Sequence, residues 1–496
     1  MIAASGWAAP AMPLSELLGR AGCAGGETSI RGLQLDSRQV QNGDLFLAVP
    51  GEQHDGRQFI EQAVANGAVA VLAEAPVAGF VDELPVPLVE IPELRFDLGP
   101  LAARFFGHPS HALHVVGVTG TNGKTTTTSL IAQLGRLQGA SCGVIGTLGA
   151  SLDDVVADSP NTTPDPISLQ KQLAQWRDLG VNTVSVEVSS HALVQGRVHG
   201  VEFKTAIYTN LSHDHLDYHG SMEVYARAKL RLFSGAGLRH AVINLDDEYA
   251  AQVVAAVPAG VEVLTYSTSR ADADIRVDSI DYGPAGVTGQ LHTPWGSGRF
   301  SSPLAGEFNL ANLAAAVTAV VLSGEELPAV LAAVSRLRAV SGRMQTIANE
   351  LGLQVGVDYA HTPDALEQVL VALKNHVRGD LVTVFGCGGD RDRAKRQVMG
   401  RVACRLSDRV VVTSDNPRSE DPAAILTDIA AGCSGNFELV ADRAQAIAMA
   451  IRESAAGDCV LIAGKGHENY QIIDGVRHQF SDQEQARKAL SSRVGS

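Results

Sequence analysis

The chain has 496 residues, of which 45% are hydrophobic and 19% charged, and its formal net charge at pH 7 is -15. This length exceeds what one hydrophobic core accommodates, so we expect three domains, and the composition excludes a disordered chain. The acidic balance argues against a protein that binds nucleic acids or membrane surfaces, which would present a basic patch. The six cysteines have no metal-binding spacing, which is typical of a reducing cytosol.

Short apolar strands alternate with helical patterns in the first 110 residues. Strands are expected over residues 44–51 and 69–74, and helices over 58–67 and 94–107. The N-terminus lacks the features of an export signal, and no apolar run reaches the roughly 20 residues of a membrane helix. We therefore expect a small α/β domain over residues 1–110, in a cytoplasmic protein.

A second α/β domain is predicted over residues 111–340. A strand at 114–120 leads through a glycine-rich loop into a helix from Lys124, and further apolar strands follow at 183–190, 205–212 and 240–247. This alternation predicts a mostly parallel sheet covered on both faces, similar to a P-loop ATPase. Turn signals within 275–305 predict an antiparallel insertion, and the alanine-rich run 309–324 predicts a long helix.

The third domain, residues 341–496, repeats the alternation of strands and helices. Helices are expected over 364–376, 397–407, 423–432 and 442–454, which predicts a doubly wound, Rossmann-like sheet. Ligands of such sheets bind at the carboxyl ends of the strands. The sequence DNPR, from Asp415 to Arg418, follows one of these strands, where it is either a plain turn or a binding site.

The most specific local signal is GVTGTNGKTTTT at residues 117–128. Glycines allow backbone N–H groups to surround phosphate oxygens, Lys124 can reach the outer phosphates, and the Thr125 hydroxyl can hold a magnesium ion. The spacing departs from GxxxxGK[ST], since Val118 stands where the first glycine is expected. An ordinary turn is the alternative, but strand, Gly-Lys-Thr triplet and helix coincide, which favours nucleotide binding.

Glu187 interrupts an apolar strand in VEVSSHALVQGR. In isolation it would be a paired carboxylate of the core. A GTPase or motor would instead show a strand ending in a magnesium-linked aspartate with a water-positioning residue. Beside a phosphate loop, Glu187 is therefore predicted to bind a metal.

Several motifs together resemble the Mur ligase family. They are TGTNGKTTT at 119–127, EVSSH at 187–191, NLSHDHLDYHGSMEVYARAK at 210–229, GEFNLANLAAA at 306–316, SGRMQ at 341–345 and DYAHTPDAL at 358–366. Within the family, DSRQVQNGDLFLAVPG, CGGDRDRAKR, DNPR and AGKGHENYQI resemble the members that add meso-2,6-diaminopimelate. The resemblance extends from about Leu35 to Glu468.

This resemblance implies a three-domain, cytoplasmic, monomeric ligase of peptidoglycan precursor synthesis that uses ATP and Mg²⁺. Its partners would be UDP-N-acetylmuramoyl-L-alanyl-D-glutamate and meso-2,6-diaminopimelate, with neither nucleic acid nor membrane involved. ATP would convert the terminal glutamate carboxylate into an acyl phosphate, which an amine of diaminopimelate displaces. Alternatives are a lysine-adding ligase, a folylpolyglutamate synthetase-like ligase and, in another class, a nucleotide-switched binding protein.

The resemblance also implies which residues form the site. Catalysis is assigned to Lys124, Glu187, His215 and Lys229. Metal ligation is assigned to Thr125, Glu187, His215 and Lys229, the last as N6-carboxylysine. ATP contacts are assigned to Gly120, Thr121, Asn122, Gly123, Lys124, Thr125, Thr126, Asn309, Arg343, Asp358 and His361.

The resemblance also implies two further sets of residues, which would bind the other two substrates. The nucleotide-linked dipeptide is assigned to Leu35, Ser37, Glu52, Gln53, His54, Asn161, Thr162, Thr163, Ser189, Gln195 and Arg197, although Glu52 stands where a histidine occurs in this type of enzyme. Diaminopimelate is assigned to Arg391, Asp415, Asn416, Pro417, Arg418, Gly464 and Glu468.

Without the resemblance, some of these residues would have a different interpretation. Helical spacing makes Lys229 a solvated surface lysine, whereas a carbamate requires a neutral, desolvated amine. Asn309 alone would be a helix N-cap. We expect His213 and His219 to have only hydrogen-bonding or packing roles.

Arg418 is predicted to select the amino acid. Diaminopimelate differs from lysine by one carboxylate, and a planar guanidinium can grip a carboxylate through two parallel hydrogen bonds. Pro417 would stiffen the turn, while Asp415 and Asn416 would receive the ammonium group.

Overall fold

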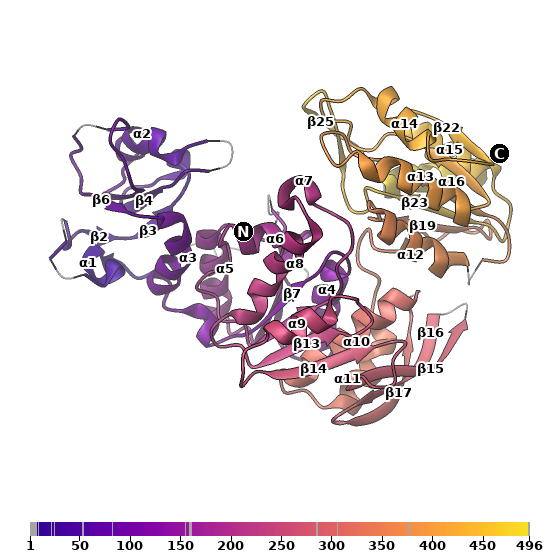
Figure 1. Ribbon diagram of the computed structural model, residues 1–496, viewed down its shortest axis with the longest axis horizontal. Coiled ribbons are helices and arrows are strands. Elements are labelled where there is room, and N and C mark those ends of the chain that lie inside the picture. The colour runs from indigo at the N-terminus through magenta and orange to yellow at the C-terminus, as the bar shows by residue number, and fades with distance from the viewer. Residues whose placement is uncertain are drawn as a thin grey trace.

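A computed structural model of the chain describes residues 7, 9–20, 22–23, 25–51, 54–81, 83–153, 155–157, 161–283, 286–304, 306–374 and 377–494. It contains three α/β units, each with its own sheet. Figure 1 shows the first unit at the left and the third at the upper right, with the central unit between and below them. The predicted three-unit α/β fold is confirmed, and the boundaries near 110 and 340 stay predictions.

The first unit is built on a four-stranded parallel sheet in the order β3-β4-β5-β6. Its strands are β3 (Gly32–Gln34), β4 (Asp44–Ala48), β5 (Ala70–Glu74) and β6 (Leu88–Ile91), with a separate antiparallel pair β1 (Met12–Pro13) and β2 (Ser29–Ile30). Its helices are α1 (Leu14–Leu18), α2 (Ile60–Ala65) and α3 (Leu94–Phe105), with the 3-10 turns η1 (Ser37–Gln39), η2 (Gly56–Phe59) and η3 (Pro109–His111). Leu45 packs with α1 and α3 while Phe46 packs with α2, because successive side chains of a strand face opposite sides.

The central sheet has eleven strands in the order β10-β9-β8-β11-β7-β12-β13-β14-β15-β16-β17. They are β7 (His114–Thr119), β8 (Cys142–Gly146), β9 (Gly149–Leu152), β10 (Val155–Ala157), β11 (Thr183–Glu187), β12 (Thr205–Tyr208), β13 (His240–Asn244), β14 (Glu262–Ser267), β15 (Ile275–Gly283), β16 (Gly286–Thr293) and β17 (Gly296–Ser302). The helices are α4 (Lys124–Leu137), α5 (Pro166–Asp178), α6 (Ser190–Val194), α7 (Leu216–His219), α8 (Met222–Leu230), α9 (Ala250–Ala256), α10 (Glu307–Leu322) and α11 (Leu327–Ala333), with η4 (Arg231–Ser234) and η5 (Val334–Arg336).

Strand β7 lies in the parallel part of this sheet and is buried on both faces. Val116 and Val118 pack against α4 and α10, while Val115 packs on the opposite face with Trp176 of α5. This double burial explains why the strand reads as a continuous apolar run. The antiparallel strands predicted within 275–305 are present, but they extend the central sheet through β14–β15 pairing instead of forming a separate insertion.

The third unit has a six-stranded sheet in the order β18-β19-β23-β20-β21-β22, in which only β18 is antiparallel to its neighbour. Its strands are β18 (Gln345–Thr346), β19 (Gln354–Asp358), β20 (Leu381–Phe385), β21 (Arg409–Val412), β22 (Phe437–Leu439) and β23 (Cys459–Ala463), and a separate hairpin pairs β24 (Tyr470–Ile473) with β25 (Val476–Gln479). Its helices are α12 (Pro363–Lys374), α13 (Ala394–Leu406), α14 (Pro422–Ala430), α15 (Arg443–Glu453) and α16 (Asp482–Val494).

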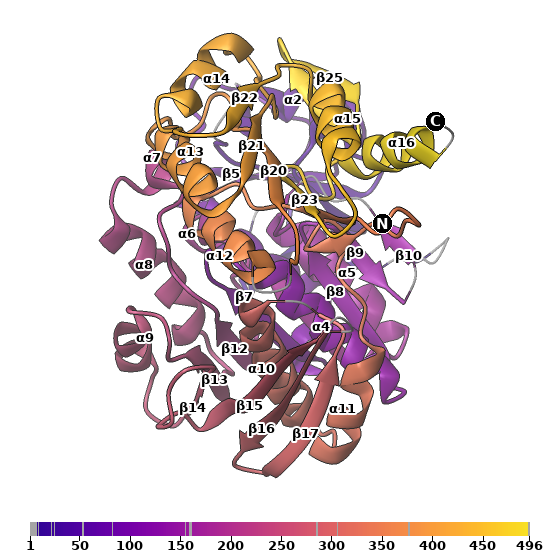
Figure 2. The same cartoon turned by 90° about the vertical axis from the view of Figure 1, so that its right-hand side faces the viewer.

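Helices cover both faces of this third sheet, as the doubly wound prediction requires. Phe385 packs with α12, α13 and α14, whereas Val384 packs with α15 and α16. Figure 2 shows the third unit above the central sheet, with α12 descending toward α10. The carboxyl ends of β19, β21 and β23 lead directly into the polar segments that begin at Tyr359, Thr413 and Gly464.

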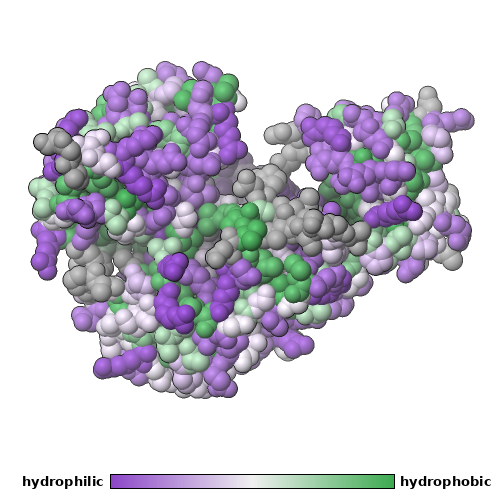
Figure 3. Space-filling model, turned by 180° about the vertical axis from the view of Figure 1, so that it is seen from behind, coloured by the Kyte–Doolittle hydropathy of each residue, from purple (hydrophilic) through white to green (hydrophobic). Residues whose placement is uncertain are grey.

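The face shown in Figure 3 is predominantly hydrophilic, with a cluster of hydrophobic residues near its middle. Within the described ranges, no helix has both the length and the apolar character needed to cross a membrane.

Candidate functional site

Residues Gly120 to Gly123 form a tight loop between β7 and α4. Gly120 has φ +150 and Gly123 has φ +85, and Cβ atoms there would lie 1.8 Å from Thr209 Oγ1 and 2.4 Å from Asn312 Oδ1, so both positions favour glycine. The N–H of Asn122 donates to Asn210 Oδ1 at 2.9 Å, which fixes the outer part of the loop. The N–H groups at the start of α4 precede the helical ladder, and such groups bind phosphate oxygens in loops of this kind.

Lys124 begins α4 and folds back over the loop. Its ammonium group donates to the carbonyl oxygens of Gly120 at 2.9 Å and Thr121 at 2.8 Å. Burial lowers the pKa of Lys124, an effect that the Glu187 carboxylate opposes. An anionic ligand would therefore gain a desolvated cation next to the loop.

Thr125 joins the loop to a carboxylate and to the third unit. Its hydroxyl donates to Glu187 Oε2 at 3.0 Å and accepts from Arg343 Nη2 at 3.0 Å. Glu187 ends β11 with 1% of its surface exposed, and Thr147 donates to it through both its N–H, at 2.9 Å, and its hydroxyl, at 3.0 Å. The side chain is therefore a carboxyl group held by hydrogen bonds beside the loop, not one paired with a cation within the core.

A cavity of about 490 Å³ opens beside the loop. Its lining comes from the central unit and from the third unit, and includes Asn122, Gly123, Thr126, Asn210, Phe308, Asn312, Arg343, Asp358, Tyr359, Asp364 and Gln368. Asn309 lies next to this lining, buried on α10, where Gly306 and not Asn309 is the N-cap residue.

Asp358 and Arg343 shape the wall that the third unit contributes. Asp358 ends β19 and accepts from the N–H groups of Met344 and Ala360, both at 2.7 Å. Burial raises the pKa of Asp358, and the Arg343 charge opposes this effect. The Arg343 guanidinium lies 4.4 Å from the centre of the Tyr359 ring, which holds its planar face in place.

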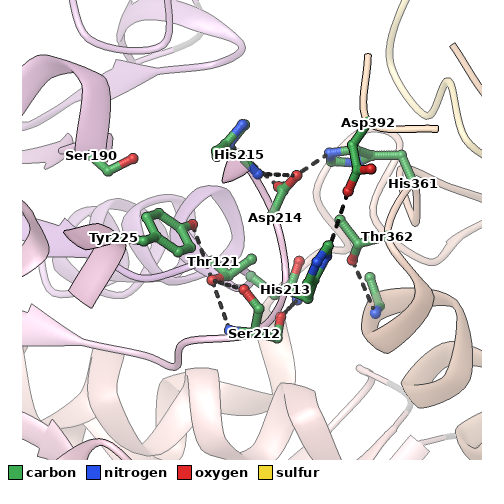
Figure 4. A network of polar contacts seen from close by, with 12 residues as sticks. Thr121, Ser190, Ser212, His213, Asp214, His215, Tyr225, His361, Thr362 and Asp392 are labelled. Carbon is green, nitrogen blue, oxygen red and sulfur yellow. Dashed lines mark hydrogen bonds and ion pairs between the residues drawn. The ribbon is translucent and has the colours of Figure 1, made fainter. Parts of the chain in front are cut away.

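Figure 4 shows a polar cluster between the central and third units. His215 Nε2 lies 3.3 Å from Asp214 Oδ2, and His361 Nε2 of the third unit lies 3.9 Å from the same oxygen. Burial lowers the pKa of His215 to about 3, partly offset by Asp214, so the imidazole is neutral near pH 7. A neutral imidazole has the lone pair that metal binding requires.

His213 and His219, expected only to pack or hydrogen-bond, take such roles. His213 Nδ1 lies 3.7 Å from Asp392 Oδ2 across the two units, as Figure 4 shows, while His219 Nε2 pairs with Ser190 Oγ at 2.9 Å.

Lys229 is buried, contrary to its helical spacing. It lies on α8 with 2% of its surface exposed, and its ammonium group is 4.2 Å from the centre of the Tyr225 ring. Among the residues that the structure describes, no carboxylate forms an ion pair with it. Burial, together with the Lys124 charge, holds the pKa of Lys229 well below its usual value. The neutral amine that carbamate formation needs is therefore favoured.

Oxygen donors near the loop suit a hard divalent cation. Thr125 and Glu187 supply a hydroxyl and a carboxylate, the types of ligand that Mg²⁺ prefers together with phosphate oxygens. Within the described part of the chain, no group of three or more His, Cys, Asp or Glu side chains is placed to hold a metal.

The residues assigned to the nucleotide-linked dipeptide fall into two regions. Leu35, Ser37 and His54 belong to the first unit, where the Ser37 hydroxyl donates to Gln62 Oε1 at 2.8 Å and His54 is exposed. Glu52 and Gln53 lie outside the described residues. Leu35, Ser37 and His54 are therefore on a different unit from the phosphate loop, as Figure 1 shows for the strands β3 and β4 of that unit.

The other region adjoins Glu187. The Thr163 hydroxyl donates to the Glu187 carbonyl at 2.7 Å and accepts from Ser189 N at 3.1 Å, and Arg197 donates to the Thr163 carbonyl at 2.9 Å. Thr162 pairs with Thr147 at 3.1 Å, while Asn161 is exposed and Gln195 is half-buried. The structure thus brings Thr162, Thr163, Ser189 and Arg197 together beside Glu187.

A second cluster, here called the acidic pocket, consists of Asp415, Asn416, Lys465 and Glu468. Asn416 Nδ2 donates to Glu468 Oε2 at 2.8 Å, and Lys465 lies between the two segments. Gly464 has φ +116, and a Cβ atom there would lie 2.6 Å from Asp415 Oδ2. The Tyr359 hydroxyl reaches Glu468 Oε1 at 3.5 Å, so one residue borders both the cavity and the acidic pocket.

Arg418 lies two residues after Asn416 of this pocket, and Arg391 lies two residues after Gly389, which Arg418 contacts. Arg418 has φ +55 and donates through Nη1 to the Gly389 carbonyl at 2.6 Å, while its N–H donates to the Ile472 carbonyl at 2.9 Å. Pro417 is buried, and Arg391 is exposed with a single contact to the Asp390 carbonyl at 3.4 Å. In the described residues no carboxylate pairs with either guanidinium, so both can meet an anionic group of a ligand.

The sequence matches three family profiles in chain order. They are described as "Mur ligase family, catalytic domain" over residues 29–105, "Mur ligase middle domain" over 118–320 and "Mur ligase, glutamate ligase domain" over 342–466. The chain belongs to the Mur ligase family.

Individual relatives of this Mur ligase agree with the profiles. A "UDP-N-acetylmuramoyl-L-alanyl-D-glutamate--2,6-diaminopimelate ligase" of Pseudomonas aeruginosa is 49% identical over 93% of this chain and 95% of its own, and one of Coxiella burnetii is 45% identical over 93% and 96%. A solved structure of a ligase with the same name is 40% identical, with a TM-score of 0.72 over 98% of this chain and 100% of that one. MurF from Acinetobacter baumannii, 18% identical with a TM-score of 0.68 over 98% and 100%, shares the fold.

The sequence-based assignment missed two buried cations of this Mur ligase. Lys465 has no exposed surface and lies between the assigned residues Gly464 and Glu468. Arg443 is equally buried, pairs with Asp482 at 2.7 Å and donates to the carbonyls of Ser414 and Ala463, at 3.3 and 2.9 Å. These carbonyls directly precede the two segments of the acidic pocket. The position of Lys465 within AGKGHE was the available signal for the first, and the sequence contained none for the second.

Proposed function

We propose that this Mur ligase joins meso-2,6-diaminopimelate to UDP-N-acetylmuramoyl-L-alanyl-D-glutamate, consuming ATP and forming ADP and phosphate. Relatives with 45 to 49% identity over more than nine-tenths of the chain have this activity in their names. One structural observation carries the proposal: Tyr359 borders both the cavity at the phosphate loop and the acidic pocket. A nucleotide and an amino acid bound there would lie on either side of one residue.

In this proposal ATP occupies the loop and the cavity of about 490 Å³. The loop N–H groups and Lys124 hold the β- and γ-phosphates, with Thr125 and Thr126 at the start of α4. Asn309, Arg343, Asp358 and His361 contact the rest of the nucleotide. Because Arg343 comes from the third unit and already bonds Thr125, nucleotide binding would hold the two units together.

Mg²⁺ bound to Thr125, Glu187 and phosphate oxygens would neutralise phosphate charge and so let an anionic carboxylate approach. His215 and a carboxylated Lys229 would hold a second cation. Carboxylation joins the neutral Lys229 amine to carbon dioxide, releasing one proton, and the burial of the side chain favours this state of the amine. The product is an anion with two oxygen donors.

The chemistry has two steps. A glutamate carboxylate oxygen attacks the γ-phosphorus, the bond to the β-phosphate oxygen breaks, and ADP leaves an acyl phosphate. The neutral amine of diaminopimelate then attacks the acyl carbon and loses a proton, the carbon–oxygen bond to phosphate breaks, and an amide forms. The chain's contribution is to position the reactants and to stabilise the developing charge.

Separate groups of residues would bind the parts of the other two substrates. Leu35, Ser37 and the 52–54 segment would hold the uridine end of the nucleotide, while Asn161, Thr162, Thr163, Ser189, Gln195 and Arg197 would hold the muramoyl dipeptide near Glu187. The acidic pocket and Arg418 would hold the end of diaminopimelate that does not react, with Arg391 and Gly464 beside it. We place the reaction in the cytoplasm, in a monomeric enzyme, and all six cysteines are free thiols.

Phosphate release with each substrate omitted in turn tests this function. Release that requires both the nucleotide-linked dipeptide and diaminopimelate supports it. Equal rates with L-lysine would favour a lysine-adding ligase, and activity on a folate would favour a folylpolyglutamate synthetase-like ligase. Slow ATP turnover indifferent to every amino acid would favour a nucleotide-switched binding protein.

A further inference from the structure

Lys465 is an enclosed cation at the centre of the acidic pocket. None of its side chain is exposed, and Nζ donates to Asn416 Oδ1 at 3.0 Å and to Glu468 Oε2 at 2.9 Å. Asp415 Oδ1 lies 3.6 Å from the same nitrogen. Because the side chain is fully enclosed, Lys465 acts on a ligand through its neighbours, and these three are its polar side-chain partners among the described residues.

Lys465 determines how the Asn416 amide is oriented. Asn416 Oδ1 accepts from Lys465 and also from the N–H of Ile472 at 3.0 Å, so the oxygen must face these donors. The amide nitrogen consequently points to Glu468 Oε2, to which it donates at 2.8 Å. Glu468 Oε2 thus receives two donors, whereas among the described residues Oε1 has only the long contact of 3.5 Å from the Tyr359 hydroxyl. Oε1 is therefore available to accept from a ligand.

The charges of the pocket match a single ammonium group. With both carboxylates ionised, Asp415, Glu468 and Lys465 have a formal sum of one negative charge, and Arg418 beside them is left for the carboxylate at the same end of the ligand. The nearby Arg443 does not alter this balance, because Asp482 pairs with it at 2.7 Å. Removing the lysine would leave the buried Asp415 and the partly exposed Glu468 without the cation between them, which is costly and favours a change of position or protonation.

We propose that Lys465 is a positioning residue that holds Glu468 and Asn416 as a receptor for the ammonium group at the unreactive end of the amino acid. This inference rests on the proposed function, because it takes an amino acid to be the ligand of the acidic pocket. It differs from the role of Arg418, which would contact the carboxylate at the same end. Lys465 would govern affinity for the amine and leave affinity for ATP unchanged.

The test compares Lys465→Met, which keeps the length but loses the charge, with Lys465→Arg and with the exposed control Lys488→Met. KM is measured for diaminopimelate, ATP and the nucleotide-linked dipeptide. We expect Lys465→Met to raise KM for diaminopimelate roughly 10- to 100-fold, the range for a lost charged hydrogen bond, with the other two KM values within about 2-fold. Lys465→Arg should recover part of the lost affinity for diaminopimelate. The control Lys488→Met should keep the wild-type KM values.

A substrate analogue separates positioning from general damage. 2-Aminopimelate has the reacting amine and both carboxylates but lacks the second amine. The wild type should prefer diaminopimelate over this analogue, and Lys465→Met should lose most of that preference. If Lys465→Met does not fold, as judged by a missing nucleotide-induced rise in Tm, Lys465→Gln takes its place, because it keeps a donor without the charge.

A folded, uncharged variant with wild-type KM for diaminopimelate and an unchanged preference over 2-aminopimelate would overturn the inference. Failure of the proposed function looks different: the wild type itself would then release no phosphate in response to diaminopimelate. The two failures are therefore distinguished within one set of assays.

Discussion

Asn122 in the phosphate loop donates to Asp364 of α12 at 3.0 Å, across 242 positions of the chain. This hydrogen bond joins the loop of the central unit to the first turn of a helix in the third unit. Burial raises the pKa of Asp364, and its hydrogen bonds to Ser212 and Asn122 oppose that effect. The contact ties the position of the third unit to the loop itself.

Loss of this contact should weaken nucleotide binding. We expect Asp364→Ala to raise KM for ATP roughly 2- to 10-fold, the range for one hydrogen bond, because the loop would no longer be held against α12. Glu367→Ala is the matched control, since Glu367 lies on the same helix and pairs with the exposed Arg405. Steady-state kinetics with varied ATP measure both, and equal KM values in the two variants would contradict the prediction.

Lys124→Ala should abolish ligation. The variant loses the cation that the loop supplies to the phosphates, and removal of one such group costs about 10² to 10³ in rate. Calorimetry should still detect binding of the nucleotide-linked dipeptide, since our assignment gives the contacts with that ligand to residues other than Lys124. Turnover close to that of the wild type would exclude the assigned role.

Carboxylation of Lys229 can be observed directly. With ¹³C-labelled bicarbonate, NMR should show a carbamate signal in the wild type and none in Lys229→Ala. The variant should be nearly inactive, and added short carboxylic acids should restore part of the activity by supplying the missing oxygens. Full activity of Lys229→Ala, or no carbamate in the active enzyme, would be incompatible with this role.

The Lys229 case shows how far the sequence can predict this site. Strand and helix rhythm predicted three α/β units, and Gly-Lys-Thr between β7 and α4 predicted the phosphate loop, because both depend on local pattern. The burial of Lys229 depends on Tyr225 and on the packing of α8, which helical spacing cannot reveal. Arg443 reads as an ordinary first residue of a helix until Asp482 and two distant carbonyls surround it.

Glu420 follows the DNPR turn and bonds the loop that contains Asp390. Its ionisation makes the stability of the fold depend on pH. It accepts from Arg396 at 2.8 Å and from Asp390 N at 2.6 Å, and the hydrogen bond from Arg396 chiefly lowers the pKa of Glu420 from 4.5 to about 2. A lowered pKa in the folded state stabilises the protein above pH 4.5, and this stabilisation is lost as pH falls toward 2. It amounts to no more than about 3 kcal/mol.

Glu420→Gln should therefore lower the free energy of unfolding at pH 7 and have less effect as the pH approaches 3. Denaturant unfolding at several pH values measures this difference. A destabilisation of equal size at pH 7 and pH 3 would show that the ionised carboxylate is not its source.

Arg418→Ala should reduce the preference for diaminopimelate over L-lysine. One charge-assisted hydrogen bond corresponds to roughly 10- to 100-fold, so the ratio of kcat/KM values should fall by about that factor. Arg401→Ala, an exposed position on α13, serves as the control. An unchanged ratio in Arg418→Ala would remove this residue from the selection of the amino acid.

Substrate identity is the central claim, and a panel of amino acids tests it most directly. The wild type is incubated with ATP, Mg²⁺ and UDP-N-acetylmuramoyl-L-alanyl-D-glutamate, and the products are measured by mass spectrometry together with phosphate release. We predict one amide product per phosphate with meso-2,6-diaminopimelate and far slower reaction with L-lysine. Equal reaction with lysine, or phosphate release without any amide product, would contradict the account.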